Sequence, residues 1–165
     1  MRAAVIFSLV APALVLAACT SRTVLDDSTG SVAADEIHVW FVKPAGEELR
    51  LVQVRRSHAP GSKLRAAVTE LLSGPTAFEM KQGLDTEIPR GTILIGLNEN
   101  GSTIELNLSR RFASGGGSSS LETRLEQLSR TVKEAAGARP VFLDVEGERL
   151  TTAAGEGLEI RQPIN

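Results

Sequence analysis

The sequence predicts an α+β domain in which two helices pack on one face of a small, mostly antiparallel or mixed sheet. Three observations predict this class. Residues 37–42 and 103–108 direct alternate side chains to opposite faces, with the period of two that half-buried strands show. Residues 64–72 and 121–135 repeat apolar side chains at helical spacing. Turn residues separate the segments in the order strand, strand, helix, strand, strand, helix, strand, and two helices on one sheet face is the economical packing for that order.

A hairpin is predicted at the start of the domain. Ile37, Val39 and Phe41 lie on one face of its first strand. The segment Pro44-Ala45-Gly46 then reverses the chain, and a second strand follows over residues 49–54 with a less regular alternation.

The first helix is predicted between a cap at Ser62 and a stop at Gly74-Pro75. Its apolar side chains fall at i, i+3, i+4, i+7 and i+8, so they form one stripe that faces a core. The stripe consists of Leu64, Ala67, Val68, Leu71 and Leu72. Residues 76–90, which follow, are expected to form a loop.

A second hairpin is predicted from residues 92–97 and 103–108, and it carries the strongest turn signal of the chain. Asn98-Glu99-Asn100-Gly101 separates the two strands, and Asn-Gly tolerates the positive φ values that a tight reversal needs. Ile104, Leu106 and Leu108 are expected on a buried face, and the opposite face is expected to be wet.

A second helix is predicted after a glycine-rich connection, residues 114–118, that is expected to be flexible. Ser119 and Glu122 have the spacing of a capping box, and Gly137 ends the helix. A last strand over residues 140–145 is expected to turn at Glu146-Gly147 and to return through residues 148–150. The side chains expected to face inward from this helix are Leu121, Leu125, Leu128, Val132 and Ala135.

Residues 1–18 have the pattern of a secretory signal peptide, with one cation, Arg2, before a nearly unbroken apolar stretch. The stretch Leu16-Ala17-Ala18-Cys19 resembles the lipobox of bacterial lipoproteins. This resemblance implies that Cys19 receives a diacylglyceryl group, that the chain is cut before it, and that the new amino terminus is acylated, for example with palmitate. A spanning helix needs about 20 apolar residues, and the apolar stretch is shorter, so a permanent membrane span is disfavoured.

A flexible tether, residues 19–35, is predicted between the anchor and the domain at residues 36–165. Its Ser, Thr, Asp, Gly and Ala side chains cannot bury enough apolar surface to fold. Lipid on Cys19 would hold the protein outside the cytoplasm, on the cell membrane or, in a Gram-negative cell, on the outer membrane. The outer-membrane address is suggested because the second residue after the cut is Thr20 and not Asp. Two or more acyl chains form a durable anchor where one is marginal.

The charge balance argues against a nucleic-acid partner. Once Arg2 is removed, 17 basic side chains face 20 acidic ones, and the net charge is −3. That balance is too mild and too mixed for a nucleic-acid surface. The chain has no Tyr and one Trp, so platforms for base stacking are scarce as well. A single cysteine allows no internal disulfide.

Three segments of the domain resemble the GerMN domain of bacterial sporulation and spore-germination proteins and of many envelope lipoproteins. The segments are Leu71-Leu72-Ser73-Gly74-Pro75-Thr76, Gly83-Leu84-Asp85-Thr86-Glu87-Ile88-Pro89-Arg90-Gly91-Thr92, and Ile104-Glu105-Leu106-Asn107-Leu108-Ser109 with Phe112. The resemblance covers residues 37–150. It implies a noncatalytic α/β module, similar to the ring-building domains of secretion-like complexes, that serves assembly at the cell surface. It offers no catalytic residue and no cofactor.

The residues themselves show no catalytic or metal-binding pattern. The two histidines, His38 and His58, stand at no recognisable ligand spacing, and each is interpreted as structural or solvated. The glycine run at residues 115–117 lacks the Lys-Ser/Thr of a phosphate loop. An acidic alternation near the last strand lacks the spacing of a calcium loop and is interpreted as a solvated face. Its members are Asp144, Glu146 and Glu148. We therefore expect no metal, no cofactor and no catalytic residue.

The candidate partner-binding residues are two arginine pairs, Arg55-Arg56 and Arg110-Arg111, each at the exit of a predicted strand. If the strand ends lie together, four guanidinium groups form a patch for phospholipid headgroups, teichoic acids or an acidic protein. Ordinary strand-end solubility is the more economical interpretation. The function expected from the whole sequence is a lipid-anchored, extracytoplasmic binding or assembly module of the cell envelope, noncatalytic, with an envelope protein or polymer as partner. The alternative is a cell-wall hydrolase or a small-ligand carrier.

Overall fold

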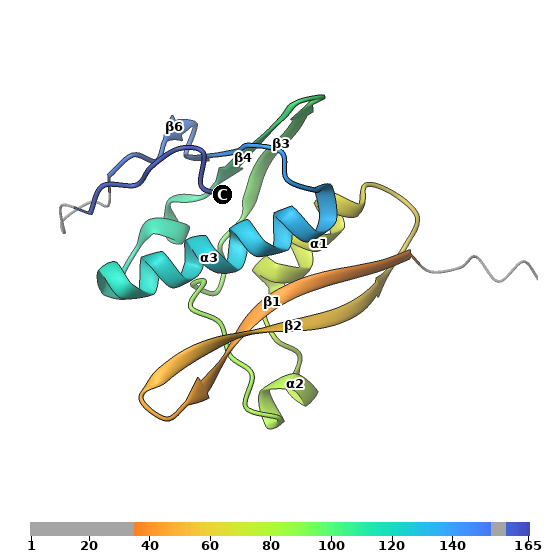
Figure 1. Cartoon of the computed structure of the whole chain (residues 1–165), viewed down its shortest axis with the longest axis vertical. Helices are drawn as coiled ribbons and strands as arrows, with labels where there is room; N and C mark the ends of the chain where they lie inside the picture. Colours follow the sequence, from red (N-terminus) through yellow and green to blue (C-terminus); the bar gives the residue numbers. More distant parts are fainter. Residues whose placement is uncertain (1–34, 153–157) are drawn as a thin grey trace, which may run out of the picture. The chain divides into compact units, whose positions relative to one another are not determined.

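The domain opens with the predicted hairpin (Figure 1). The computed structural model describes residues 35–152 and 158–165, so the predicted signal peptide, Cys19 and nearly all of the tether lie outside the described residues. Strands β1 (Asp35–Ala45) and β2 (Glu48–His58) pair antiparallel. Ile37, Val39 and Phe41 are fully buried, which confirms the predicted inward face.

Helix α1 (Lys63–Ser73) has the predicted limits and the predicted inward face. The Ser62 side chain accepts a hydrogen bond from the Arg65 backbone N–H, and Gly74 ends the helix with a φ of 80°. A left-handed residue at this position favours glycine, because it has no Cβ to clash. The buried side chains are Leu64, Ala67, Val68 and Leu71, and Leu72 is half-buried.

The segment after α1, predicted as a loop, contains a short helix, α2 (Ala77–Lys81). Thr76 and Glu79 form a capping box in which the Thr76 side chain accepts from the Glu79 N–H and the Glu79 carboxylate accepts from the Thr76 N–H. The sequence holds the Thr-x-x-Glu signal for this cap. The prediction of a loop was wrong here. The helix was overlooked because it is too short to show an apolar stripe of several turns.

The remaining strands form a mixed four-stranded sheet in the order β3-β4-β5-β6. Its members are β3 (Leu94–Asn100), β4 (Thr103–Leu108), β5 (Val141–Val145) and β6 (Glu148–Arg149). β4 and β5 run parallel, and the other pairs are antiparallel. The side chains predicted to be buried on β4 are fully buried, while the opposite face of that strand is half-buried rather than wet.

The predicted α+β class is confirmed, and its strands divide between two sheets. Side chains of α3 occupy the outer edge of β1, where a further strand would otherwise pair. Thr131 Oγ1 accepts from the Trp40 N–H at 3.0 Å, and Gln127 Nε2 donates to the Trp40 carbonyl at 2.9 Å. One residue pair further along this edge, Val42 and Asp85 exchange backbone hydrogen bonds of 2.9 and 2.8 Å. The hairpin therefore stays a separate two-stranded sheet.

Helix α3 (Gly117–Ala136) follows a short 3-10 turn, η1 (Arg110–Ala113), and begins earlier than its predicted capping box. Its N-cap is Gly116 in the left-handed region, with a φ of 85°. The connection predicted to be flexible is held in place, because Arg124 of α3 donates to the carbonyls of Ser114 and Gly115. The predicted inward residues divide into buried Leu121, Leu128 and Val132 and half-buried Leu125 and Ala135.

One core joins the hairpin, the helices and the sheet. α3 packs beside β1 and against α1 (Figure 1). The C-terminal residues bond to the backbone of β5. Ile164 N donates to the Val141 carbonyl at 2.8 Å, and Gln162 Oε1 accepts from Leu143 N at 3.0 Å. All buried core side chains among the described residues lie between Ile37 and Ile160, within one unit that begins at Ala33. Among the described helices, none has both the length and the apolar character needed to span a bilayer.

Candidate functional site

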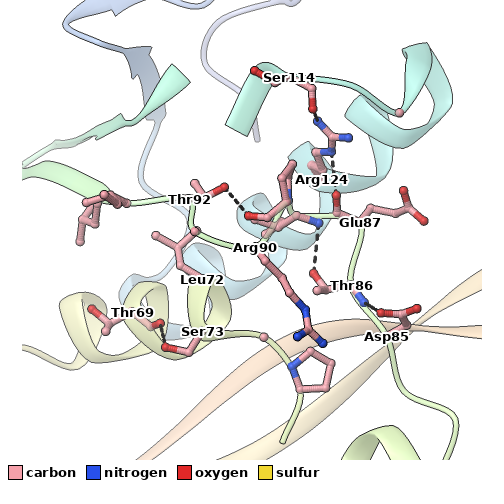
Figure 2. A pocket seen from close by; sticks show the side chains of 18 of the residues that line it. Thr69, Leu72, Ser73, Asp85, Thr86, Glu87, Arg90, Thr92, Ser114 and Arg124 are labelled. Carbon is pink, nitrogen blue, oxygen red and sulfur yellow. Dashed lines mark hydrogen bonds between the residues drawn. The ribbon is translucent and has the colours of Figure 1, made fainter. Parts of the chain in front are cut away.

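A groove of about 940 Å³ lies between α1 and the start of β3 (Figure 2). We call it the α1–β3 groove. Its walls are the exposed side of α1, the chain from Asp85 to Leu94, Met80 of α2, and the turn before α3. The side chains or backbone that line it include Arg65, Thr69, Leu72, Ser73, Gly74, Pro75, Met80, residues 85–94, residues 114–116 and Arg124.

The segments that resemble the GerMN domain supply most of the groove. Residues 72–75 belong to the first segment, and residues 85–92 belong to the second. Residues of two of these motifs therefore meet at one concave surface. Concave surfaces with apolar walls and a few polar groups are where proteins bind other molecules most often.

A buried polar stripe on α3 fixes the shape of this groove. Ser120, Arg124, Gln127 and Thr131 follow one another at helical spacing, and each is buried. Arg124, whose side chain is 3% exposed, donates to the Glu87 carbonyl at 2.8 Å and to the Phe112 carbonyl at 2.9 Å. It thereby ties the groove wall at residue 87 to the turn before α3 (Figure 2). Burial lowers the pKa of Arg124, and the nearby Glu87 carboxylate opposes that shift.

Gln127 also holds the groove wall, through the backbone N–H of Glu87 where Arg124 uses its carbonyl. Its Oε1 accepts from the Glu87 N–H at 3.0 Å, while its Nε2 donates to the Trp40 carbonyl on β1. The side chains of Ser120 and Glu87 also join, with the serine hydroxyl donating to the carboxylate at 2.5 Å. Since these polar groups already have hydrogen-bond partners within the protein, we assign them to stabilising the wall and not to binding a ligand.

The exposed side chains of the groove are cationic and apolar. Arg65 and Arg90 are exposed, and neither forms an ion pair with any residue that the structure describes. The Arg90 side chain extends toward Ser73 and Asp85, and its Nη2 lies 3.7 Å from Met80 Sδ (Figure 2). Met80 and Ile93 remain 42% and 61% exposed, which is high for apolar residues of a folded domain.

The four arginines proposed from the sequence differ in their surroundings. Arg56 is 11% exposed and donates to Glu70 Oε2 at 2.6 Å and to Glu79 Oε2 at 2.5 Å. Its charge is thus compensated inside the fold. Arg55 lies on the opposite face of β2, 70% exposed and 3.5 Å from a Glu36 carboxylate oxygen.

The second arginine pair lies on η1 and is exposed. Arg111 Nε donates to the Arg90 carbonyl at 2.5 Å, so this arginine stands beside the α1–β3 groove. Arg110 is bound through its backbone N–H to the Glu146 carboxylate. A partner-binding role for the four arginines stays a prediction, and Arg56 is the one whose charge already has partners inside the fold.

Local partners also surround the two histidines and Asp144. The ring nitrogens of His38 lie 3.4 Å from Glu36 and 3.5 Å from Glu134, and His58 Nδ1 lies 2.6 Å from the Ala59 carbonyl. Asp144 pairs with Arg149 at 3.0 Å. Within residues 35–152 and 158–165, no three His, Cys, Asp or Glu side chains gather in a way that could hold a metal ion. Cys19, the predicted lipid acceptor, lies outside the described residues.

Sequence reasoning missed the α3 stripe, although a signal for it exists. Ser120, Arg124, Gln127 and Thr131 are spaced by four, three and four residues, one position before the apolar stripe. A polar row at that spacing is usually assigned to solvent. It turns inward here because the edge of β1 and the chain at residue 87 present backbone groups that need partners.

Comparison with known proteins agrees with this architecture. The family model Germane, described as sporulation and spore germination, matches residues 38–151. The first GerMN domain of the sporulation protein GerM from Bacillus subtilis is similar, with a TM-score of 0.61, 14% identity, and coverage of 78% of this chain and 95% of that one.

The tandem GerMN domains of the same Bacillus subtilis protein give a TM-score of 0.57 at 17% identity. That match covers 84% of this chain and 49% of the tandem structure, so this chain spans about half of it. A comparison with curated proteins gave no significant match. Because the family model spans well over half of the sequence and the fold agrees, the chain belongs to the Germane family and has a GerMN-type fold.

Proposed function

We propose that this protein is a lipid-anchored, extracytoplasmic module that binds or assembles with another component of the cell envelope and performs no catalysis. The α1–β3 groove is its binding surface. The observation that carries the proposal is the meeting of the two family-like segments, residues 71–76 and 83–92, at that groove.

The chemistry of the groove supports binding over catalysis. A hydrolase needs a nucleophile or an activated water, together with a base and an orienting partner. Several hydroxyls line the groove, and those of Ser73, Thr92 and Ser114 donate to backbone carbonyls. The Glu87 carboxylate accepts from Ser120, and no histidine stands among the lining residues. Two exposed arginines and several apolar side chains are groups that recognise a partner instead.

The lipid anchor rests on the sequence at residues 16–19. Replacement of the acceptor, as Cys19→Ser, should abolish incorporation of labelled palmitate and leave the precursor uncut. Label that persists in the variant would contradict the anchor.

The binding role is tested in cells that produce the full-length protein. A photoreactive phenylalanine analogue at Met80, in the groove wall, should give one discrete crosslinked species, while the same analogue at exposed Arg50 on β2 should not. Equal capture at both positions would contradict the groove as the binding surface. Turnover of cell-wall fragments by the purified protein, lost on replacement of Glu87, would favour the hydrolase.

A further inference from the structure

We propose that the α1–β3 groove receives an extended polypeptide segment that pairs with the free edge of β3 and places an acidic side chain against Arg65 and Arg90. This inference rests on the proposed function, because it names the class of partner that the same groove would bind.

One edge of β3 is unpaired among the described strands. This strand is the end strand of its sheet, with β4 on one side only. Within the described residues, the backbone of β3 bonds to β4, and the Asn100 carbonyl also accepts from the Ser102 N–H in the turn between the two strands. Just before the strand, the Ile93 carbonyl accepts from the Ser109 N–H. The N–H and C=O groups of alternate residues along this seven-residue strand therefore face away from β4 and can pair with a partner strand, and this is how extended peptides join exposed sheet edges.

The start of this edge is apolar. Ile93, just before β3, and Ile95 are 61% and 49% exposed, and the first four residues of β3 include no charged residue and no proline. Natural proteins usually protect an edge strand with such residues or cover it. A bulge places Ile95 between Leu94 and Gly96 without a partner residue on β4. Bulges often re-aim a side chain next to a binding site. An edge with these features fits a partner that covers it.

The groove also carries positive charge that is not compensated by an ion pair in the described part of the chain. Arg65 on α1 and Arg90 beside β3 stand on the two sides of the groove, and neither has a carboxylate partner within residues 35–152 and 158–165. Of the acidic side chains that line the groove, Glu87 already accepts from Ser120, and Asp85 accepts from the Thr86 N–H. An acidic side chain of the partner would accept charge-assisted hydrogen bonds from the two arginines and compensate their charge.

The same observations favour a polypeptide over an anionic polymer. A polyanion is held by a row of cations, whereas here the two arginines share the groove with exposed Asp85 and with the apolar side chains of Leu72, Met80 and Ile93. Apolar side chains that alternate with acidic ones along an extended peptide would match both kinds of surface, and the peptide backbone would match the strand edge.

The test uses the unit from Ala33 to Asn165, which carries its own core, and a displayed library of random 12-residue peptides as the probe. We expect enrichment of peptides that combine alternating apolar residues with Asp or Glu. A selected peptide should bind at least tenfold more weakly to the Arg90→Glu and Arg65→Glu variants. The matched variant Arg50→Glu, on β2 outside the groove, should bind as the parent does.

Strand pairing has its own readout. A bound strand directs the N–H groups of alternate residues toward its neighbour. N-methylation of a selected peptide at alternate residues should therefore abolish binding in one frame and leave it nearly unchanged in the other. Equal effects in both frames would exclude pairing with β3.

Other outcomes would overturn the inference while leaving the proposed function in place. Enrichment of basic peptides, or of none, would exclude an acidic polypeptide. If polyglycerol phosphate bound instead, and Arg90→Glu removed that binding, the groove would be a polyanion site. Failure of the proposed function would show separately, as loss of the Met80 crosslink in cells.

Discussion

Replacement of Arg56 by methionine tests whether the hairpin is fastened to α1 and α2 by charge. The Arg56 guanidinium bonds to the carboxylates of Glu70 and Glu79 and to the Gly74 carbonyl at 3.1 Å. It also lies over the Phe41 ring, 5.1 Å from its centroid. One side chain of β2 thus holds the end of α1 and the start of α2.

The expected cost follows from the burial of each partner. Removal of one member of a buried ion pair typically costs about 3–5 kcal/mol, because the other charge is left without compensation. Glu79, 12% exposed, would suffer that penalty, whereas Glu70, 40% exposed, can return to water. We therefore expect Arg56→Met to lower the free energy of unfolding by about 2–4 kcal/mol, or the melting temperature by roughly 10 °C.

Arg55→Met is the matched control, since it makes the same chemical change one residue earlier. Its ion pair with Glu36 is long and exposed, and such pairs contribute about 0–1 kcal/mol. Thermal unfolding followed by circular dichroism measures both variants. If the two melting temperatures fell by the same amount, the guanidinium of Arg56 would not be fastening the hairpin, and the reasoning would fail.

Three further predictions concern the core, the turn before α3 and acid. Leu71→Ala should cost about 2–5 kcal/mol because Leu71 is fully buried, while Thr69→Ala on the exposed side of α1 should stay within about 0.5 kcal/mol in a denaturant titration. Gly116→Ala should cost about 3–5 kcal/mol, since a Cβ there would collide with Arg124 and Ser120, and Gly115→Ala, which meets nothing within 4 Å, should cost only about 1–2 kcal/mol of left-handed strain. Burial alone would raise the pKa of Glu79, but hydrogen bonds and attraction from Arg56 and the Thr76 N–H outweigh it and leave the pKa below its ordinary value of 4.5. The folded state then takes up the proton less readily than the unfolded state, so stability should fall as the pH drops below about 4.5, and a Glu79→Gln variant should show a shallower fall in urea midpoints.

Periodicity in the sequence was sufficient to predict the helices and hairpins with simple patterns. Leu64 to Leu71 repeat at helical spacing before a stop at Gly74, and Ile104 to Leu108 alternate after the Asn100-Gly101 turn, so local sequence and final packing agree. The inward face of β1 was predictable for the same reason. Such agreement is expected where side-chain burial alone decides the structure.

Long-range polar partners could not be predicted in this way. Nothing local distinguishes Arg56 from Arg55, and only the pairing of β1 with β2 places Arg56 on the face that meets α1 and α2. The division into two sheets has the same origin, because it depends on Gln127 and Thr131 meeting Trp40 across about ninety residues of chain. The groove could not be predicted either, since its walls come from segments that only the fold brings together.

The buried polar stripe on α3 also bears on how the groove could bind a partner. A loop that lines a binding surface normally loses conformational freedom on binding, and that loss weakens the complex. Here Arg124 and Gln127 hold the wall at Glu87 through its carbonyl and its N–H before any partner arrives. The wall is therefore already ordered, and little further entropy need be lost when a segment settles beside β3. This rigidity explains why a helix would keep an arginine and a glutamine in its buried face, where leucine would pack with less risk of an unsatisfied group.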